Sequence, residues 1–139
     1  MNQTAIFWPM MAHVLLVYIV YLVLLRRRAA AVRAGHAKPA DFRERSAEPA
    51  ESVTAYNDLV NQFELPVLFH IVCLCFFVTN GANFVVLALA WLFALSRYVH
   101  AAIHLTGNRL RHRHPVFVFG IAVLGAMWVF FALHLLGLT

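Results

Sequence analysis

The residues whose types and spacing could do chemistry lie near residue 100, in an otherwise apolar stretch. Its polar side chains recur every three or four positions: Arg97, His100, His104 and Asn108. At about 100° per residue in an α-helix, these positions fall within roughly 80° of one another. An arginine at membrane depth usually faces the interior of a bundle or a watery cavity. This helix face therefore predicts a pocket that binds an anion.

A second polar face lies where the preceding apolar stretch begins. Its members are spaced i, i+4 and i+7, and they are Asn57, Asn61 and Glu64. Glu64 is the acid that we expect to reach a span, at a depth similar to that of Arg97. We therefore predict that the two faces meet in the cytoplasmic half of the protein, beside the basic residues at 109–113. A simpler interpretation is that Arg97 and Glu64 form a buried ion pair that fixes helix register, with Asn61 bonding between helices.

The histidines allow a different interpretation. His100 and His104 are an i, i+4 pair, which is a spacing that can hold a metal. Histidines in the other apolar stretches could join them in ligating a haem or a non-haem metal: His13, His70 and His134. No second dense histidine cluster and no group of acidic ligands accompanies the pair in the sequence. We therefore expect no metal site.

Four long apolar stretches must position these side chains. They cover about residues 6–25, 62–78, 84–105 and 116–138. Each is close to the ~20 residues that a helix needs to cross a hydrocarbon core, and backbone groups in lipid must be satisfied internally. Of the 139 residues 63% are hydrophobic and 12% are charged, against about 25% charged in a soluble domain. We predict a single membrane domain, residues 1–139, folded as an all-α bundle of four antiparallel transmembrane helices.

The basic residues predict the orientation of these helices. Ten of the eleven Lys and Arg residues lie in two loops, at about residues 26–61 and 106–115. Because cytoplasmic loops are enriched in Lys and Arg, we expect both loops inside and both termini outside; in a bacterial cell the membrane would be the inner one. The net charge of +5 then indicates contact with lipid headgroups or an anionic cosubstrate, and it does not suggest nucleic acid.

Two segments of the chain resemble a known family. The run NDLVNQFELPVLF at residues 57–69 is similar to the second-helix signature of the membrane-associated proteins in eicosanoid and glutathione metabolism, the MAPEG family. In that signature an Asn is followed three residues later by Glu, with a Pro shortly after. The segment RYVH at residues 97–100 and the pair NR at residues 108–109 resemble the family's third helix and the loop after it. The resemblance covers about residues 5–137 and indicates a divergent member of prokaryotic type.

The resemblance implies both an assembly and an activity. Members form four-helix bundles that assemble as homotrimers, with active sites between subunits on the cytoplasmic side. Many conjugate glutathione to lipophilic electrophiles that arrive through the bilayer, or reduce lipid hydroperoxides. The resemblance therefore implies a membrane glutathione transferase or peroxidase-like enzyme with glutathione as cosubstrate. A nearby Arg would lower the pKa of the thiol, and the thiolate is the nucleophile.

Carried onto this sequence, the family pattern assigns catalysis to Arg109, which would activate the thiol, and to Arg97. The cosubstrate would be bound by the other polar residues of the two faces and the following loop: Asn57, Asn61, Glu64, His100, His104, Asn108 and Arg113. Asn57 stands where glutathione-using members carry Arg, and His104 stands where a Tyr is expected. The residues leave open a non-enzymatic protein of the same fold that binds lipid or a helical partner, or a metal or haem protein.

Overall fold

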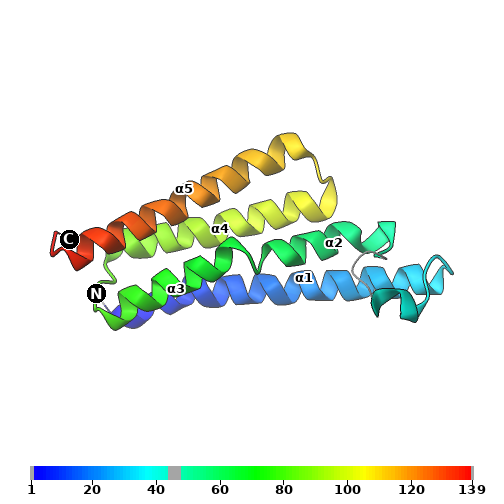
Figure 1. Cartoon of the computed structure of the whole chain (residues 1–139), viewed down its shortest axis with the longest axis horizontal. Coiled ribbons are helices and arrows are strands. Elements are labelled where there is room, and N and C mark those ends of the chain that lie inside the picture. Colours follow the sequence, from blue (N-terminus) through cyan, green and yellow to red (C-terminus); the bar gives the residue numbers. More distant parts are fainter. Residues whose placement is uncertain (1, 44–47, 139) are drawn as a thin grey trace.

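The computed structural model describes residues 2–43 and 48–138, and over these residues the regular elements are all helices (Figure 1). In chain order they are η1 (Gln3–Ile6), α1 (Phe7–Arg33), η2 (Pro39–Arg43), α2 (Ala50–Asn61), α3 (Leu65–Val78), α4 (Phe84–Thr106) and α5 (Leu110–Leu135). Four segments are long and apolar enough to cross a membrane: Gln3–Arg33, Ala50–Val78, Phe84–Thr106 and Leu110–Leu135. The predicted four-helix membrane bundle is confirmed.

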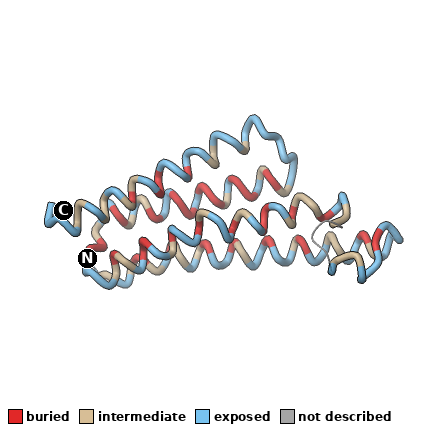
Figure 2. The backbone as a smooth tube through the Cα atoms, in the orientation of Figure 1, coloured by how far each residue is buried: buried red, intermediate tan, exposed pale blue. Residues whose placement is uncertain are grey.

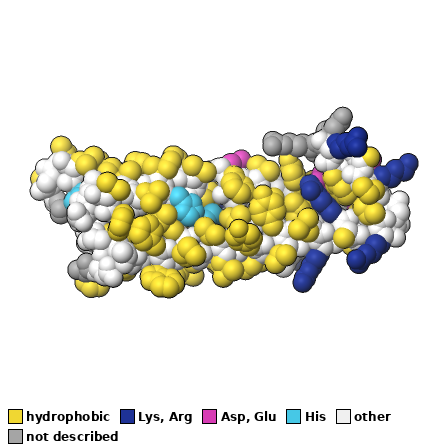
Figure 3. Space-filling model, turned by 90° about the horizontal axis from the view of Figure 1, so that it is seen from below, with side chains coloured by type: hydrophobic (Ala, Val, Ile, Leu, Met, Phe, Trp, Pro, Cys, Tyr) yellow, Lys and Arg dark blue, Asp and Glu magenta, His cyan; other side chains and the backbone are white. Residues whose placement is uncertain are grey.

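The two basic loops lie at the same end of the bundle. Figure 1 shows both termini at one end, and the α1–α2 and α4–α5 connections at the other. In Figure 3, the Lys and Arg side chains in view gather at one end of a largely hydrophobic face. We call this the basic end. Residues 44–47, including the basic Arg45 of the first loop, lie outside the described residues.

The helices continue well into the segment that we expected to be a loop, with a partial helix only near residues 52–59. α1 runs on to Arg33, and α2 occupies residues 50–61. Ala and Arg are strong helix formers, and the chain leaves α1 only at Gly35, whose φ of 76° suits a residue without a Cβ. Polarity at residues 26–61 indicates exposure to water, but it does not prevent a helix. The segment therefore extends the bundle beyond its apolar part.

The second membrane segment is broken between α2 and α3. Pro66 lies in the first turn of α3, where its ring would clash with the carbonyl of Gln62 if the helix were continuous. The break falls at residues 62–64, and Glu64 leaves helical geometry with φ −93° and ψ −106°. As a result Gln62 is buried, whereas Phe63 and Glu64 are exposed.

Buried residues follow the inner faces of the helices (Figure 2). They form two hydrophobic clusters. One contains Phe69, Phe76 and Phe93, and the other, on the side of the basic end, contains Leu16, Leu24 and Ala101. The interior also holds buried polar side chains: His13, Ser52, Asp58, Gln62, Ser96, Arg97, His100 and His104. A buried polar group without a hydrogen-bond partner is costly. Three buried atoms of the described residues have none: Asp58 Oδ2, Arg97 Nε and His104 Nδ1.

Candidate functional site at the basic end

A cavity of about 240 Å³ lies between α2, α4 and α5 near the basic end. Its lining residues are Asn61, His100, Leu110, Arg113, His114 and Phe117. Asn61 comes from α2, His100 from α4 and Arg113 from α5, so three helices bring together three residues that the sequence predicted for cosubstrate binding. His114 and Phe117 also line the cavity and were not predicted. We call this the basic-end cavity.

Arg113 is held at the edge of this cavity by two hydrogen bonds. Its Nη1 donates to His104 Nε2 and to Asn108 Oδ1, both at 2.7 Å. Asn108 adopts a left-handed conformation with φ 43°, which Asn tolerates better than most residues. This turn between α4 and α5 places the Asn108 side chain against Arg113. The predicted residues Asn108, His104 and Arg113 are thus in contact.

The carboxylate that meets the α4 histidines is that of Asp58. Its Oδ1 lies 3.3 Å from His104 Nδ1 and 3.7 Å from His100 Nδ1, and the Asp58 side chain is fully buried. Arg97 is also buried, with 1% of its surface exposed, and its Nη2 lies 3.4 Å from His100 Nδ1. Its guanidinium carbon lies 5.8 Å from the ring centroid of Phe117. Positive and negative charges therefore share the interior next to the cavity.

We expected Glu64 in the position that Asp58 takes. Glu64 is exposed and lines a separate cavity of about 550 Å³ that also contains Arg28, Arg43 and Glu48. The ion pairs of the described residues do not include one between Arg97 and Glu64. The reason is geometric, because a step of one residue turns a helix by about 100°, and the buried face of α2 is one residue out of step with the face that we chose.

A sequence signal for this face did exist. Four buried residues follow one another at steps of three, three and four: Ser52, Ala55, Asp58 and Gln62. Small residues at helical spacing mark a face that another helix approaches closely. Asn57, which we expected at the site, is exposed on α2.

The arginines predicted to be catalytic lie in different places. Arg97 is behind His100, inside the bundle. Arg109 is exposed immediately before α5, and it does not line the basic-end cavity. Among the arginines of the described residues, Arg113 is the one that lines this cavity.

Asp58, His100 and His104 form a group that has the residue types of a metal site. One ligand atom from each lies within 4.8 Å of the others. Their hydrogen bonds favour another interpretation. Arg113 can only donate, so His104 Nε2 accepts and the neutral ring carries its proton on Nδ1. Arg97 likewise directs an N–H at His100 Nδ1. His100 Nδ1 thus faces a donor of Arg97, whereas His104 Nδ1 lies 3.3 Å from Asp58 Oδ1 and has no hydrogen-bond partner among the described residues. The group surrounds the buried Arg97 and Asp58.

A comparison with protein families agrees with this architecture. The model of the MAPEG family matches residues 5–133. The chain belongs to the MAPEG family. No curated protein and no solved structure is similar enough to count as a match. The resemblance that we drew from residues 57–69 and 97–109 is thereby confirmed, and the basic-end cavity is the candidate functional site of a multi-pass MAPEG protein.

Proposed function

We propose that this MAPEG protein is a membrane-bound glutathione transferase or peroxidase-like enzyme that acts on lipophilic electrophiles. The observation that carries the proposal is the convergence of Asn61, His100 and Arg113 on one cavity, with the buried Arg97 behind His100. Positive groups beside a thiol lower its pKa, and the thiolate formed is the nucleophile. In the transferase reaction the thiolate sulfur attacks the electrophilic carbon, a C–S bond forms, and the leaving group departs.

Within this proposal Arg113 is the residue that stabilises the thiolate. It lines the cavity and already donates to two neighbours, so its guanidinium is fixed in place before the cosubstrate arrives. Arg97 adds positive potential from the interior and orients His100. Arg109 is exposed at the same end, where it attracts an anionic tripeptide towards the cavity.

We further propose that a neighbouring subunit completes the site. The cavity of about 240 Å³ is smaller than the roughly 300–1,000 Å³ of typical ligand pockets. Asn57 and Glu64 are exposed in the single chain and can contact glutathione or the next subunit. The proposed assembly is a homotrimer with sites between its subunits. The charge distribution favours an orientation with the basic end in the cytoplasm and both termini outside.

The experiment is a titration of detergent-purified protein with glutathione. Calorimetry measures binding, and ultraviolet difference absorbance detects the thiolate. We expect saturable binding with a thiolate band near neutral pH. Because a hydrogen bond to a charged group contributes about 1.5–3 kcal/mol, Arg113→Gln should weaken binding roughly ten- to hundredfold and remove the band.

The matched control is Arg111→Gln. It removes the same charge from an exposed position on the same helix and should leave both readouts nearly unchanged. Absence of binding at millimolar glutathione would refute the proposal. An Arg113→Gln variant with full binding and a full thiolate band would refute the role given to Arg113.

A further inference from the structure

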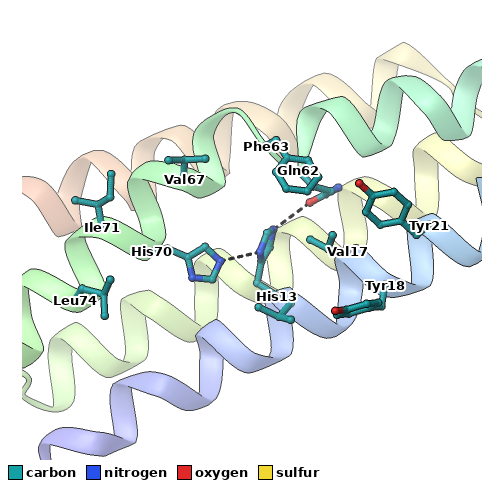
Figure 4. A pocket seen from close by; sticks show the side chains of 11 residues that line it. His13, Val17, Tyr18, Tyr21, Gln62, Phe63, Val67, His70, Ile71 and Leu74 are labelled. Atoms are coloured by element: carbon teal, nitrogen blue, oxygen red, sulfur yellow. Dashed lines mark hydrogen bonds between the residues drawn. The ribbon is translucent and has the colours of Figure 1, made fainter. Parts of the chain in front are cut away.

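A third cavity, of about 500 Å³, lies between α1 and the broken α2–α3 segment. It has no lining residue in common with the basic-end cavity. Most of its lining is apolar or aromatic, but His13, His70 and Gln62 lie in its middle (Figure 4). Figure 3 shows histidine side chains near the centre of this largely hydrophobic face, away from the basic end. We call this cavity the histidine groove.

A chain of hydrogen bonds leads from the groove to Asp58. His70 Nε2 lies 3.1 Å from His13 Nδ1, and His13 Nε2 lies 3.2 Å from Gln62 Oε1. Gln62 Nε2 in turn donates to Asp58 Oδ1 at 3.4 Å. His13, Gln62 and Asp58 are buried, whereas His70 is partly exposed. The chain of hydrogen bonds therefore runs from the partly exposed His70, in the groove, to the buried Asp58 inside the bundle.

The carboxylate at the inner end fixes the direction of every bond. Asp58 accepts, so the amide NH₂ of Gln62 must face it and the amide oxygen must face His13. His13 consequently carries its proton on Nε2, which leaves Nδ1 as the acceptor. His70 then donates through Nε2, and its remaining nitrogen, Nδ1, carries a lone pair.

His70 Nδ1 is a hydrogen-bond acceptor without a partner among the described residues. A polar atom without a partner at this depth is unfavourable, because lipid chains offer no donor. An ionisable residue within a membrane segment is by default a functional-site hypothesis. The groove thus combines a large apolar volume with one acceptor of fixed orientation.

We propose that the histidine groove is a second binding site, which takes a lipophilic phenol whose hydroxyl donates to His70 Nδ1. The hydroxyl supplies the donor that the nitrogen lacks, and the ring would lie among apolar and aromatic lining residues, which include Tyr18, Tyr21 and Phe63. The volume of about 500 Å³ falls within the roughly 300–1,000 Å³ of small-molecule pockets. This site goes beyond the proposed glutathione chemistry and does not depend on it.

The test compares two probes that differ only in the donor, 4-octylphenol and its methyl ether 4-octylanisole. Both are titrated into the full chain in detergent micelles, with the imidazole nitrogens followed by ¹⁵N NMR. We expect the unliganded protein to show His70 protonated on Nε2 and His13 protonated on Nε2. The phenol should shift the His70 Nδ1 resonance saturably and bind roughly tenfold tighter than the ether, as one hydrogen bond of about 1–1.5 kcal/mol implies.

His70→Phe keeps an aromatic ring but removes both nitrogens, so it should reduce phenol affinity to that of the ether. The matched control is His134→Phe, the same substitution at a histidine that contacts Thr79 and does not line the groove; it should keep the preference for phenol. The comparison of the two probes uses the unaltered protein, so it stands even where a variant fails to fold.

Equal affinity for phenol and ether would overturn the proposal and indicate that the groove holds lipid chains. Exclusion of both probes, together with disulfide cross-linking between chains through Val67→Cys, would also overturn it and indicate that a second copy covers the groove. Binding of octylphenol by a protein that binds no glutathione would refute the proposed function and leave this inference standing.

Discussion

The bundle contains two histidine pairs whose surroundings differ. His100 and His104 lie one turn apart on α4, between two arginines and the cavity at the basic end. His13 and His70 come from α1 and α3 and lie among apolar and aromatic side chains. Asp58 is the point where the surroundings of the two pairs meet, because it lies against His104 and also accepts from Gln62.

This difference shows that the neighbouring groups determine which ring nitrogen of a histidine donates a hydrogen bond and which accepts one. Arg113 forces His104 to accept through Nε2, whereas the oxygen of Gln62 requires His13 to donate through Nε2. The same ring nitrogen therefore has opposite roles in the two pairs. Under the two proposals made above, one pair lies beside arginines that bind an anion, and the other presents an acceptor to the histidine groove.

The largest effect is expected from Asp58→Ala, which acts on both regions at once. It removes the buried carboxylate near Arg97 and leaves His104 and Gln62 without the carboxylate that they contact. Loss of one partner from a buried charged group typically lowers the free energy of unfolding by about 3–5 kcal/mol. Unfolding by denaturant in mixed micelles measures it.

The control for this change is Asn57→Ala. Asn57 is adjacent on α2 but exposed, and surface substitutions usually change the free energy of unfolding by less than about 0.5 kcal/mol. If the Asp58 and Asn57 variants were equally stable, the two histidine pairs would not depend on a shared carboxylate.

An intermediate effect is expected from His13→Phe, which acts on the histidine groove alone. The Phe ring conserves most of the buried volume but leaves Gln62 Oε1 without its donor, as well as removing the bond to His70. An unsatisfied buried acceptor costs about 1–3 kcal/mol, so the free energy of unfolding should fall by this amount. Glutathione binding at the basic-end cavity should be preserved. Its loss would mean that the two regions are coupled more strongly than a shared Asp58 explains.

The smallest effect concerns an ion pair at the basic end, whose acid, Glu48, lies outside the four membrane segments. It is a more exposed ion pair to compare with the buried Asp58. Arg28 Nε donates to Glu48 Oε1 at 2.9 Å, and this bond holds the pKa of Glu48 below its ordinary value of about 4.5, against the opposing effect of burial. A carboxyl with a lowered pKa stabilises the fold above its unfolded pKa. That contribution is lost as the pH falls through the pKa in the folded protein.

At neutral pH the free energy of unfolding of the wild-type protein should therefore be about 0.5–1 kcal/mol higher than that of the Glu48→Gln variant. The difference should disappear under acidic conditions below the pKa of the folded protein. Repeating the comparison in an Arg28→Gln background should remove most of the pH dependence. A pH-independent difference would assign the effect to packing.

Much of the fold could be predicted from the sequence, because the bilayer imposes strict requirements. A run of about 20 apolar residues must be a helix in lipid, and the positions of Lys and Arg placed the two loops at the same end of the bundle (Figure 1). The helical extension of α1 to Arg33 was missed, whereas α2 was expected in part. Polarity alone does not separate a loop from a helix that extends into water.

The candidate site could be predicted only in part. Helical periodicity correctly placed His100 and His104 on one face, and Asn61 and Arg113 do line the cavity with His100. Asp58 was missed in favour of Glu64, because a helix face of α2 cannot be chosen without knowing which side its neighbours cover. The break before Pro66 then exposed Glu64 and buried Gln62.

By itself, the sequence determined the membrane class, the four helices, the family and the grouping of basic residues, since these follow from local composition and from spacing along single helices. Only the tertiary structure decided which acid meets Arg97 and that His13 and His70 form a pair across two helices. It also showed that Asp58 links both regions. These contacts join residues far apart in the chain, and their partners depend on helix rotation and on the position of one helix break.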